Sequence, residues 1–228
     1  MLFLVLGRGK TGSLVAEVAH ERGHGVRVLG EEENRDASAL TAPFLASFDA
    51  VIDFTTPEAA IPNLRACLAN GAHVVVGTTG WYERLEDMRT LAIRKNAGFL
   101  YGTNFSVGVQ TLLRMARELA LAAPHYYRFS IAETHHSGKK DAPSGTALSI
   151  KRVIEAANPT VKIEISFKRE GDASGIHLIE ARSDYDVIEL KHEAFSRRGF
   201  AEGAVRAAEW ITGKTGVWEF SEIASELN

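Results

Sequence analysis

One turn near the amino terminus constrains the fold of this chain more than any other feature. The apolar run at residues 2–6 leads directly into a GxGxxG turn, and an amphipathic segment follows from Ser13. Glycines spaced in this way between a strand and a helix permit a tight turn and let a pyrophosphate approach the backbone, where the helix N-terminus offers N–H groups. We therefore predict that this turn binds a dinucleotide through Gly7, Arg8, Gly9, Lys10, Thr11 and Gly12. A glycine turn that only joins a strand to a helix is the alternative.

The first half of the chain alternates short apolar runs with amphipathic segments. The runs lie at residues 2–6, 26–29, 50–53, 73–76 and 98–101, and helical spacing is found at 13–22, 57–70 and 83–95. Apolar strands that alternate with helices are typical of a parallel sheet covered on both faces. The fold class that we predict is therefore α/β, with a Rossmann-type doubly wound parallel sheet.

The pattern changes after about Ser106. A helix is predicted at residues 107–121, a strand at 126–132, a helix from about Ser144, and strands at 162–168, 176–182 and 185–192. Strict alternation in 162–168 predicts one buried and one polar face. This half should form a second α+β domain with an open mixed or antiparallel sheet, and its uncovered face could become a subunit interface.

The last predicted helix, at residues 200–211, and the segment 217–220 are expected to return to the first domain. We therefore predict a dinucleotide-binding domain made of residues 1–105 and 200–228. Residues 106–199 would form the domain for substrate binding and oligomerisation.

Polar turns follow the other predicted strands of the first domain. Glu31 lies about 20 residues beyond the glycine turn, where an acidic side chain accepts hydrogen bonds from a ribose. The adjacent Glu32 and Glu33 are interpreted as solvated. Three consecutive carboxylates would nevertheless repel a 2′-phosphate and favour NADH slightly over NADPH, unless Arg8, Lys10 or Arg35 offsets them. At the next two strand ends we expect cofactor contacts from Phe54, Thr55, Gly77, Thr78 and Thr79. Taken alone, those turns would be ordinary helix caps.

The segment from Glu133 to Ala147 has the sequence ETHHSGKKDAPSGTA and carries most of the polar chemistry of the chain. The absence of apolar residues between His135 and Ala142 predicts an exposed loop, and Pro143 and Ser144 predict the start of a helix. The N-terminal N–H groups and hydroxyls of that helix, together with the Lys139 ammonium, would form a receptor for carboxylates. A neighbouring histidine could deliver a proton.

Three interpretations of this segment remain open on the residues alone. A zinc site is disfavoured because adjacent histidines rarely both reach one ion, and we expect no metal. A solvated basic loop is the second interpretation. An anion-binding and proton-transfer site is the third, and the dinucleotide turn elsewhere in the chain favours it.

Composition excludes several classes of function. The net charge of -3 gives no general reason to bind nucleic acid or an anionic membrane. No apolar stretch approaches the roughly 20 residues that span a bilayer, and the opening apolar run does not have the charge order of a signal peptide. The single cysteine, Cys67, fits a reducing compartment, so we expect a cytoplasmic protein.

Several motifs resemble one known family. Besides the segment from Glu133 to Ala147, the similarity covers GTTG at residues 77–80, NFSVGV at 104–109 and FAEGAVRAA at 200–208. Together they resemble the dihydrodipicolinate reductase family, also called 4-hydroxy-tetrahydrodipicolinate reductase. Motifs in this order extend over nearly the whole chain.

The resemblance implies the reduction of 4-hydroxy-tetrahydrodipicolinate, a cyclic dicarboxylate derived from pyruvate and aspartate semialdehyde, to tetrahydrodipicolinate. It implies NADH or NADPH as the cofactor, a role in lysine and diaminopimelate synthesis, and a homotetramer joined through the second sheet. His135 would be the general acid or base and Lys139 its cationic partner. The substrate carboxylates would be held by His136, Lys139, Ser144, Gly145 and Thr146. The crossing between the domains, near the nicotinamide, would be formed by Gly102, Thr103, Asn104 and Phe105.

The sequence departs from the family pattern at a few positions. The glycine turn is one residue shorter than in many members, the acidic stretch after the second strand is short, and Ser137 and Gly138 replace bulkier residues. These differences concern cofactor preference more than reaction type. The alternatives are another dehydrogenase of the aspartate or homoserine type, and a non-catalytic NAD(P)-binding sensor.

Overall fold

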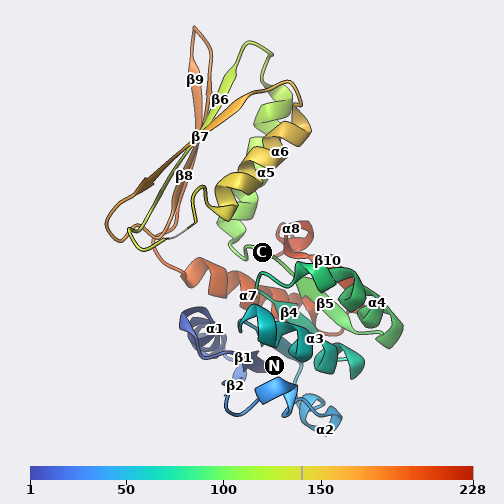
Figure 1. The fold of residues 1–228 in the computed structure, drawn as a ribbon. Coiled ribbons are helices and arrows are strands. Elements are labelled where there is room, and N and C mark those ends of the chain that lie inside the picture. Colours follow the sequence, from blue (N-terminus) through green and yellow to red (C-terminus); the bar gives the residue numbers. More distant parts are fainter. Residues whose placement is uncertain (140, 228) are drawn as a thin grey trace. The chain divides into compact units, whose positions relative to one another are not determined.

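The computed structural model describes residues 1–139 and 141–227. The chain divides into two compact units, one formed by Met1–Val107 with Arg198–Asn228 and the other by Gly108–Arg197 (Figure 1). No helix in the described ranges is long and apolar enough to cross a membrane.

The first unit is built on a six-stranded sheet in which every pair of neighbouring strands is parallel. The strand order is β10-β5-β4-β3-β1-β2 (Figure 1). The strands are β1 (Leu2–Leu6), β2 (Gly25–Leu29), β3 (Ala50–Asp53), β4 (Val74–Val76), β5 (Gly98–Tyr101) and β10 (Gly216–Glu219). Because all six run in one direction, their carboxyl ends share one edge, where ligands bind in such sheets. The predicted doubly wound sheet is confirmed.

Helices cover both faces of this sheet. The helices are α1 (Lys10–Glu21), α2 (Ala42–Leu45), α3 (Pro57–Ala69), α4 (Leu85–Lys95), α7 (Arg198–Ile211) and α8 (Phe220–Ile223), with short 3₁₀ turns η1 (Arg35–Ala37) and η2 (Tyr82–Arg84). Residues of α1, α7 and α8 share one apolar core with the sheet, and residues of α2, α3 and α4 share the other. The sheet is therefore buried on both sides, which explains its unbroken apolar strands.

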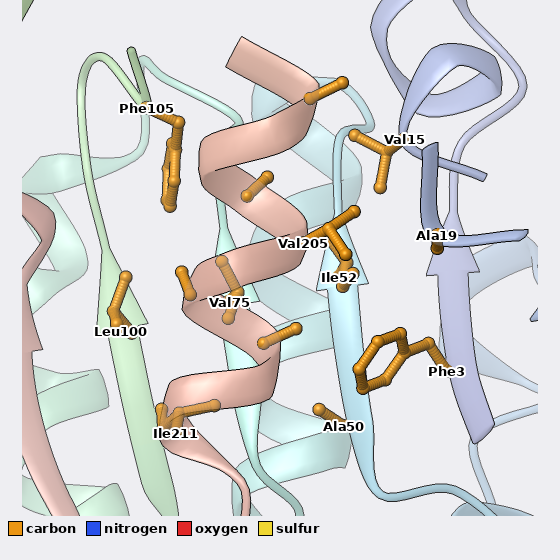
Figure 2. Close-up of a cluster of buried hydrophobic side chains, with 14 of the residues drawn as sticks. Phe3, Val15, Ala19, Ala50, Ile52, Val75, Leu100, Phe105, Val205 and Ile211 are labelled. Carbon is orange, nitrogen blue, oxygen red and sulfur yellow. The ribbon is translucent and has the colours of Figure 1, made fainter. Parts of the chain in front are cut away.

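Helix α7 brings the end of the chain back to the first unit. Figure 2 shows it lying over the sheet, roughly along the strands, with Val205 and Ile211 facing Ile52, Val75 and Leu100. Its sequence is rich in buried small residues, which allow a close approach to the strands. That close approach positions the loop that follows β5 at the carboxyl edge of the sheet.

The second unit contains a four-stranded sheet in the order β7-β6-β8-β9. The strands are β6 (Arg128–His135), β7 (Ile163–Arg169), β8 (Ile176–Arg182) and β9 (Val187–Glu193). β6 pairs with β7 in parallel and with β8 antiparallel, so the sheet is mixed, as the predicted fold class allows. Helices α5 (Val107–Ala122) and α6 (Gly145–Ala157) pack on one face through residues such as Ile131, Ile150 and Ile179. Along β6 and β8, the side chains that alternate with these core residues lie on the opposite face of the sheet. Most of them are polar or half-buried.

Candidate active site

The three glycines of the N-terminal turn have different surroundings. A Cβ on Gly7 would lie 2.3 Å from the backbone oxygen of Phe54, and a Cβ on Gly12 would lie 2.2 Å from the backbone oxygen of Gly7. Around the corresponding position on Gly9, no described atom outside the neighbouring residues lies within 4 Å. Gly7 and Gly12 are therefore required by packing, whereas Gly9 borders open space that a pyrophosphate can enter. This geometry fits a dinucleotide.

Helix α1 begins at Lys10, directly after this open position. Gly9 is its N-cap and, within the described residues, no side chain caps the helix. The first N–H groups of the helix and its partial positive charge are therefore available to an anion. Arg8 and Lys10 are exposed beside them and add formal positive charge.

A cavity of about 960 Å³ lies at the carboxyl ends of β1, β2 and β3. Its volume is that of a small-molecule site. It brings together the predicted residues Gly7, Arg8, Gly9, Glu31, Phe54 and Thr55. The other predicted residues of the turn, Lys10, Thr11 and Gly12, are not among its lining residues, and neither are Gly77, Thr78 and Thr79.

Glu33 is an acidic side chain of this cavity that has defined contacts. Its Oε2 accepts the Gly30 N–H at 2.8 Å, and its carboxylate pairs with the Arg8 guanidinium at 2.8 Å. Glu31 lines the same cavity. Glu33 is exposed, as its interpretation as a solvated residue implies, and the turn after β2 also directs its carboxylate to the Gly30 N–H and to Arg8.

A buried carboxylate connects the turns after β3 and β4. Asp53 accepts hydrogen bonds from the hydroxyl of Thr55 at 2.7 Å, from the hydroxyl of Thr78 at 2.8 Å and from the amide of Asn63 at 2.9 Å. Burial raises its pKa, against the effect of these hydrogen bonds. Sequence reasoning missed Asp53 and Asn63, although a carboxylate closing a fully apolar strand was the available signal. The Thr78 hydroxyl is thus used to hold the turns together.

Aromatic side chains form the part of this edge where the nicotinamide was expected. A Cβ on Gly77 would lie 2.2 Å from the Phe54 ring, and the Phe54 and Phe105 ring centroids are 6.0 Å apart. Helix α7 supports Phe105 from behind, since a Cβ on Gly203 would lie 1.7 Å from its backbone oxygen. Of the other predicted residues, Gly102 is buried against Phe105, Thr79 and Thr103 are exposed, and Asn104 accepts the Ser106 N–H at 2.9 Å.

In the second unit, His135 lies inside a strand rather than in an exposed loop. β6 runs to His135, three residues beyond the predicted strand, because it continues to pair with β7 as far as Arg169. His135 is only 6% exposed and lies on the same side of the sheet as Ile131. The predicted loop therefore begins at His136. The polarity of the segment had suggested that His135 is exposed. Its burial results from the pairing of β6 with β7 and from the alternation of side chains along β6.

Glu133 forms the centre of a buried polar cluster. It is 2% exposed, and its two oxygens accept the Ser144 N–H at 3.0 and 3.2 Å. Arg169 donates to the same carboxylate at 2.9 Å. Burial disfavours its charge, but the hydrogen bonds from Ser144 and Arg169 outweigh that effect and lower the pKa of Glu133. The carboxylate is therefore ionised at neutral pH.

Two histidines face this carboxylate. The Nδ1 of His135 lies 3.7 Å and the Nε2 of His177 lies 3.6 Å from Glu133 Oε2. The rings are 5.1 Å apart in an edge-to-face arrangement. Burial, followed by the charge of His135, lowers the pKa of His177 to about 4, and burial also lowers that of His135 against the effect of Glu133. Both rings are thus largely neutral at pH 7. Sequence reasoning missed Glu133, His177 and Arg169 as site residues.

The predicted carboxylate receptor lies at the start of α6. Ser144 is the N-cap, and its Oγ accepts the Ala147 N–H at 3.1 Å, so this buried hydroxyl serves the helix. The Cβ position of Gly145 has no described atom within 4 Å beyond its neighbours, and Thr146 is half-buried. Lys139 is paired with Asp141 at 2.8 Å. His136 is half-buried and follows β6 directly.

The cluster also has the spacing of a metal site, because ligand atoms of Glu133, His135 and His177 lie within 4.8 Å of one another. The sequence had offered no such set, since β6 and β8 bring these residues together. However, both Glu133 oxygens already accept N–H groups, and Arg169 places a positive charge on the carboxylate. This arrangement suits a proton site better than a metal ion.

Comparison with known proteins decides the family. The model of the dihydrodipicolinate reductase N-terminus matches residues 1–105, and the model of its C-terminus matches residues 108–223. The chain belongs to the dihydrodipicolinate reductase family. The family predicted from the sequence motifs is confirmed.

Individual relatives of the chain support this family assignment. The 4-hydroxy-tetrahydrodipicolinate reductase of Christiangramia forsetii is 34% identical over 242 residues, covering 100% of this chain and 99% of the relative. That of Natronomonas pharaonis is 37% identical, covering 92% and 94%. A dipicolinate-bound dihydrodipicolinate reductase from Paenisporosarcina sp. TG-14 shares the fold, with a TM-score of 0.82, 23% identity and coverage of 98% and 99%.

Members of this family are oxidoreductases that use NADH or NADPH and act on a small molecule. The open space at Gly9 and the uncapped start of α1 are consistent with such a cofactor. The predicted class of enzyme and the predicted cofactor type are therefore confirmed.

Proposed function

We propose that this chain reduces 4-hydroxy-tetrahydrodipicolinate to tetrahydrodipicolinate with NADH or NADPH, in lysine and diaminopimelate biosynthesis. The observation that carries the proposal is the presence in one chain of two half-sites. One is the glycine turn with its open position at Gly9, and the other is the buried His135 beside the start of α6. A dinucleotide-binding sensor would need only the first.

The first unit holds the cofactor, which when bound supplies a hydride from its nicotinamide ring. Gly9 and the first N–H groups of α1 bind the pyrophosphate. The Asp53 hydrogen bonds fix the turns after β3 and β4, which carry Thr55 and Thr79 to the same edge. Phe54 and Phe105 provide an apolar surface for the nicotinamide end and exclude water from it.

The second unit holds the substrate by its two carboxylates. The N–H groups of Gly145 and Thr146 bind one carboxylate at the positive end of α6, and His136 and Lys139 bind the other. Lys139 exchanges its Asp141 partner for the substrate. The net reaction takes up one hydride and one proton and releases water, and His135 supplies the proton to the ring atom that gains charge.

The Arg8–Glu33 pair supports a preference for NADH. A 2′-phosphate needs a cation, and of the two arginines in the cavity lining, Arg8 and Arg35, Arg8 is paired with Glu33 at 2.8 Å. Removing that carboxylate should therefore shift selection toward NADPH. The Arg8–Glu33 pair thus adds to the preference for NADH that the three consecutive glutamates predicted.

We also propose a cytoplasmic homotetramer. The sheet face of the second unit opposite α5 and α6 carries the outward residues of β6 and β8, which a second copy would cover. The family's biosynthetic role fits the cytoplasm, and the free Cys67 fits a reducing compartment.

The test is steady-state oxidation of NADH and NADPH, with the substrate generated in situ from pyruvate and aspartate semialdehyde by the preceding enzyme. Rapid oxidation that depends on both precursors is expected. Oxidation of either cofactor with aspartate or homoserine-type substrates only would indicate a different dehydrogenase. Tight NADH binding without turnover on any of these substrates would indicate the sensor.

A further inference from the structure

The buried charge of Glu133 has no role in the reaction as proposed above, although it lies at the centre of the substrate half-site. A carboxylate removed from water must be well paired, and a buried polar network is costly unless its members are satisfied. Glu133 meets this requirement through Ser144 and Arg169. The same contacts connect it to the start of α6 and, through Arg169 and Asp141, to Lys139.

Three connections leave this carboxylate. The first runs to α6, since the Ser144 N–H donates to both oxygens at the start of the proposed carboxylate receptor. The second runs through Arg169, whose guanidinium donates to Glu133 and also to the backbone oxygen of Asp141 at 2.6 Å, and Asp141 in turn pairs with Lys139 at 2.8 Å.

The third connection is to the proton donor. His135 Nδ1 lies 3.7 Å from Glu133 Oε2 and has no hydrogen-bond partner among the described residues. A contact of this length shortens to a hydrogen bond when the ring is charged, and catalytic hydrogen bonds are often long before substrate binds. Glu133 Oε2 is thus placed to accept a hydrogen bond from the Nδ1–H of His135.

We propose that Glu133 is a positioning residue of this site, because its carboxylate holds the His135 imidazole, the start of α6 and, through Arg169 and Asp141, the Lys139 ammonium in one arrangement. This inference rests on the proposed function of His135. Glu133 also stabilises the charged form of His135 and thereby offsets part of the effect of burial on the pKa of that ring.

The charges around His135 lead us to expect opposite shifts of its pKa in two variants. Glu133 and Asp141 raise the pKa of His135, whereas burial, Lys139 and Arg169 lower it. His177 is neutral at pH 7, and His192, which neighbours His177 across β8 and β9, also has a pKa lowered by burial. Loss of the Glu133 charge should therefore lower the pKa of His135, and loss of the Arg169 charge should raise it.

The experiment is a histidine-selective NMR titration of the full chain without substrate, with the His135 signal assigned through His135→Gln. Glu133→Gln keeps an oxygen that can accept from Ser144 but removes the charge. We expect the His135 titration to move down by about one pH unit in Glu133→Gln and upward in Arg169→Gln. Glu180→Gln, in the same sheet and paired with Arg182, is the matched control and should leave it unchanged.

Activity provides the second readout. The basic limb of the kcat/KM profile, where the protonated donor is lost, should move to lower pH in Glu133→Gln and to higher pH in Arg169→Gln. We expect kcat to fall about tenfold or more in Glu133→Gln, with NADH affinity within twofold of the parent protein. A purely structural role would give no opposite shifts.

An unchanged His135 titration in folded Glu133→Gln would overturn the inference. So would stoichiometric Zn²⁺ uptake that His135→Gln abolishes, which would assign the cluster to a metal. If Glu133→Gln does not fold, the Arg169→Gln titration still decides, because a shift to lower pH contradicts the charge assignment. Absence of turnover in the parent protein would refute the proposed function. It would not decide the role of Glu133, because the titration is measured without substrate.

Discussion

Replacing Gly9 and Gly12 one at a time separates what the glycine turn does for the fold from what it does for the cofactor. In Gly12→Ala the new Cβ would lie 2.2 Å from the backbone oxygen of Gly7, and a backbone atom cannot rotate away. Such overpacking typically costs about 1–3 kcal/mol. For a chain of this size that corresponds to a fall in Tm of roughly 2–12 °C.

Gly9→Ala should behave in the opposite way. Gly9 has φ of -71°, which alanine adopts readily, and no described atom beyond its neighbours lies within 4 Å of the new Cβ. Stability should stay within about 0.5 kcal/mol of the parent, or rise slightly because the unfolded chain loses freedom. The added methyl group would occupy the space for the pyrophosphate, so we expect NADH affinity to fall about tenfold or more, or roughly 1.4 kcal/mol.

The assay pairs thermal unfolding with an NADH titration followed by nicotinamide fluorescence, on the same preparations. Gly12→Ala should lower Tm, and Gly9→Ala should lower affinity without lowering Tm. Parent-like NADH binding by Gly9→Ala would refute the assignment of the open position to the pyrophosphate. A parent-like Tm for Gly12→Ala would refute the packing argument.

Three further predictions follow from the contacts. Glu33→Gln keeps an acceptor for the Gly30 N–H but frees Arg8, so affinity for 2′,5′-ADP should rise about fivefold while that for 5′-AMP stays constant. An equal gain in Glu32→Gln, the charge-matched control, would point to the general field of the loop instead. Lys139→Ala should raise KM for the substrate and lower kcat without changing NADH affinity, and a parent-like KM would remove Lys139 from the receptor. Gly203→Ala should lower Tm by several degrees, since its Cβ would lie 1.7 Å from a backbone oxygen, and unchanged thermal unfolding would contradict that placement.

The first unit was predictable because its signals are local. Strand β1 at Leu2–Leu6, strand β3 at Ala50–Asp53 and strand β5 at Gly98–Tyr101 begin and end where the apolar runs do. Strands covered on both faces must be apolar throughout, and short polar turns must follow them. The glycine spacing then predicts the tight turn after β1.

The buried cluster of the second unit was not predictable in this way. Glu133 and His177 are opposite each other only because β6 and β8 pair antiparallel in one register, and no local pattern specifies that register. The segment after residue 132 is polar, and polarity suggested a loop. The burial of His135 results from β7 pairing alongside, which is a tertiary effect.

The choice between neighbouring carboxylates was also beyond the sequence. Glu31, Glu32 and Glu33 are chemically identical, and their distance from the glycine turn favours Glu31. The fold gives Glu33 the contacts with Gly30 and Arg8, because the turn after β2 directs that side chain back to the strand end. Spacing predicts a role for this turn, and the backbone path determines which of its carboxylates contacts Gly30 and Arg8.

The most direct test of the account is the kcat of His135→Gln with the substrate generated in situ, measured beside its Kd for NADH. The proposed mechanism assigns proton delivery to His135 and cofactor binding to the other unit. It therefore predicts that kcat falls about 100-fold or more while the Kd stays within twofold of the parent value. A variant that keeps the parent kcat would contradict the central claim, because the reaction would then draw its proton from another group.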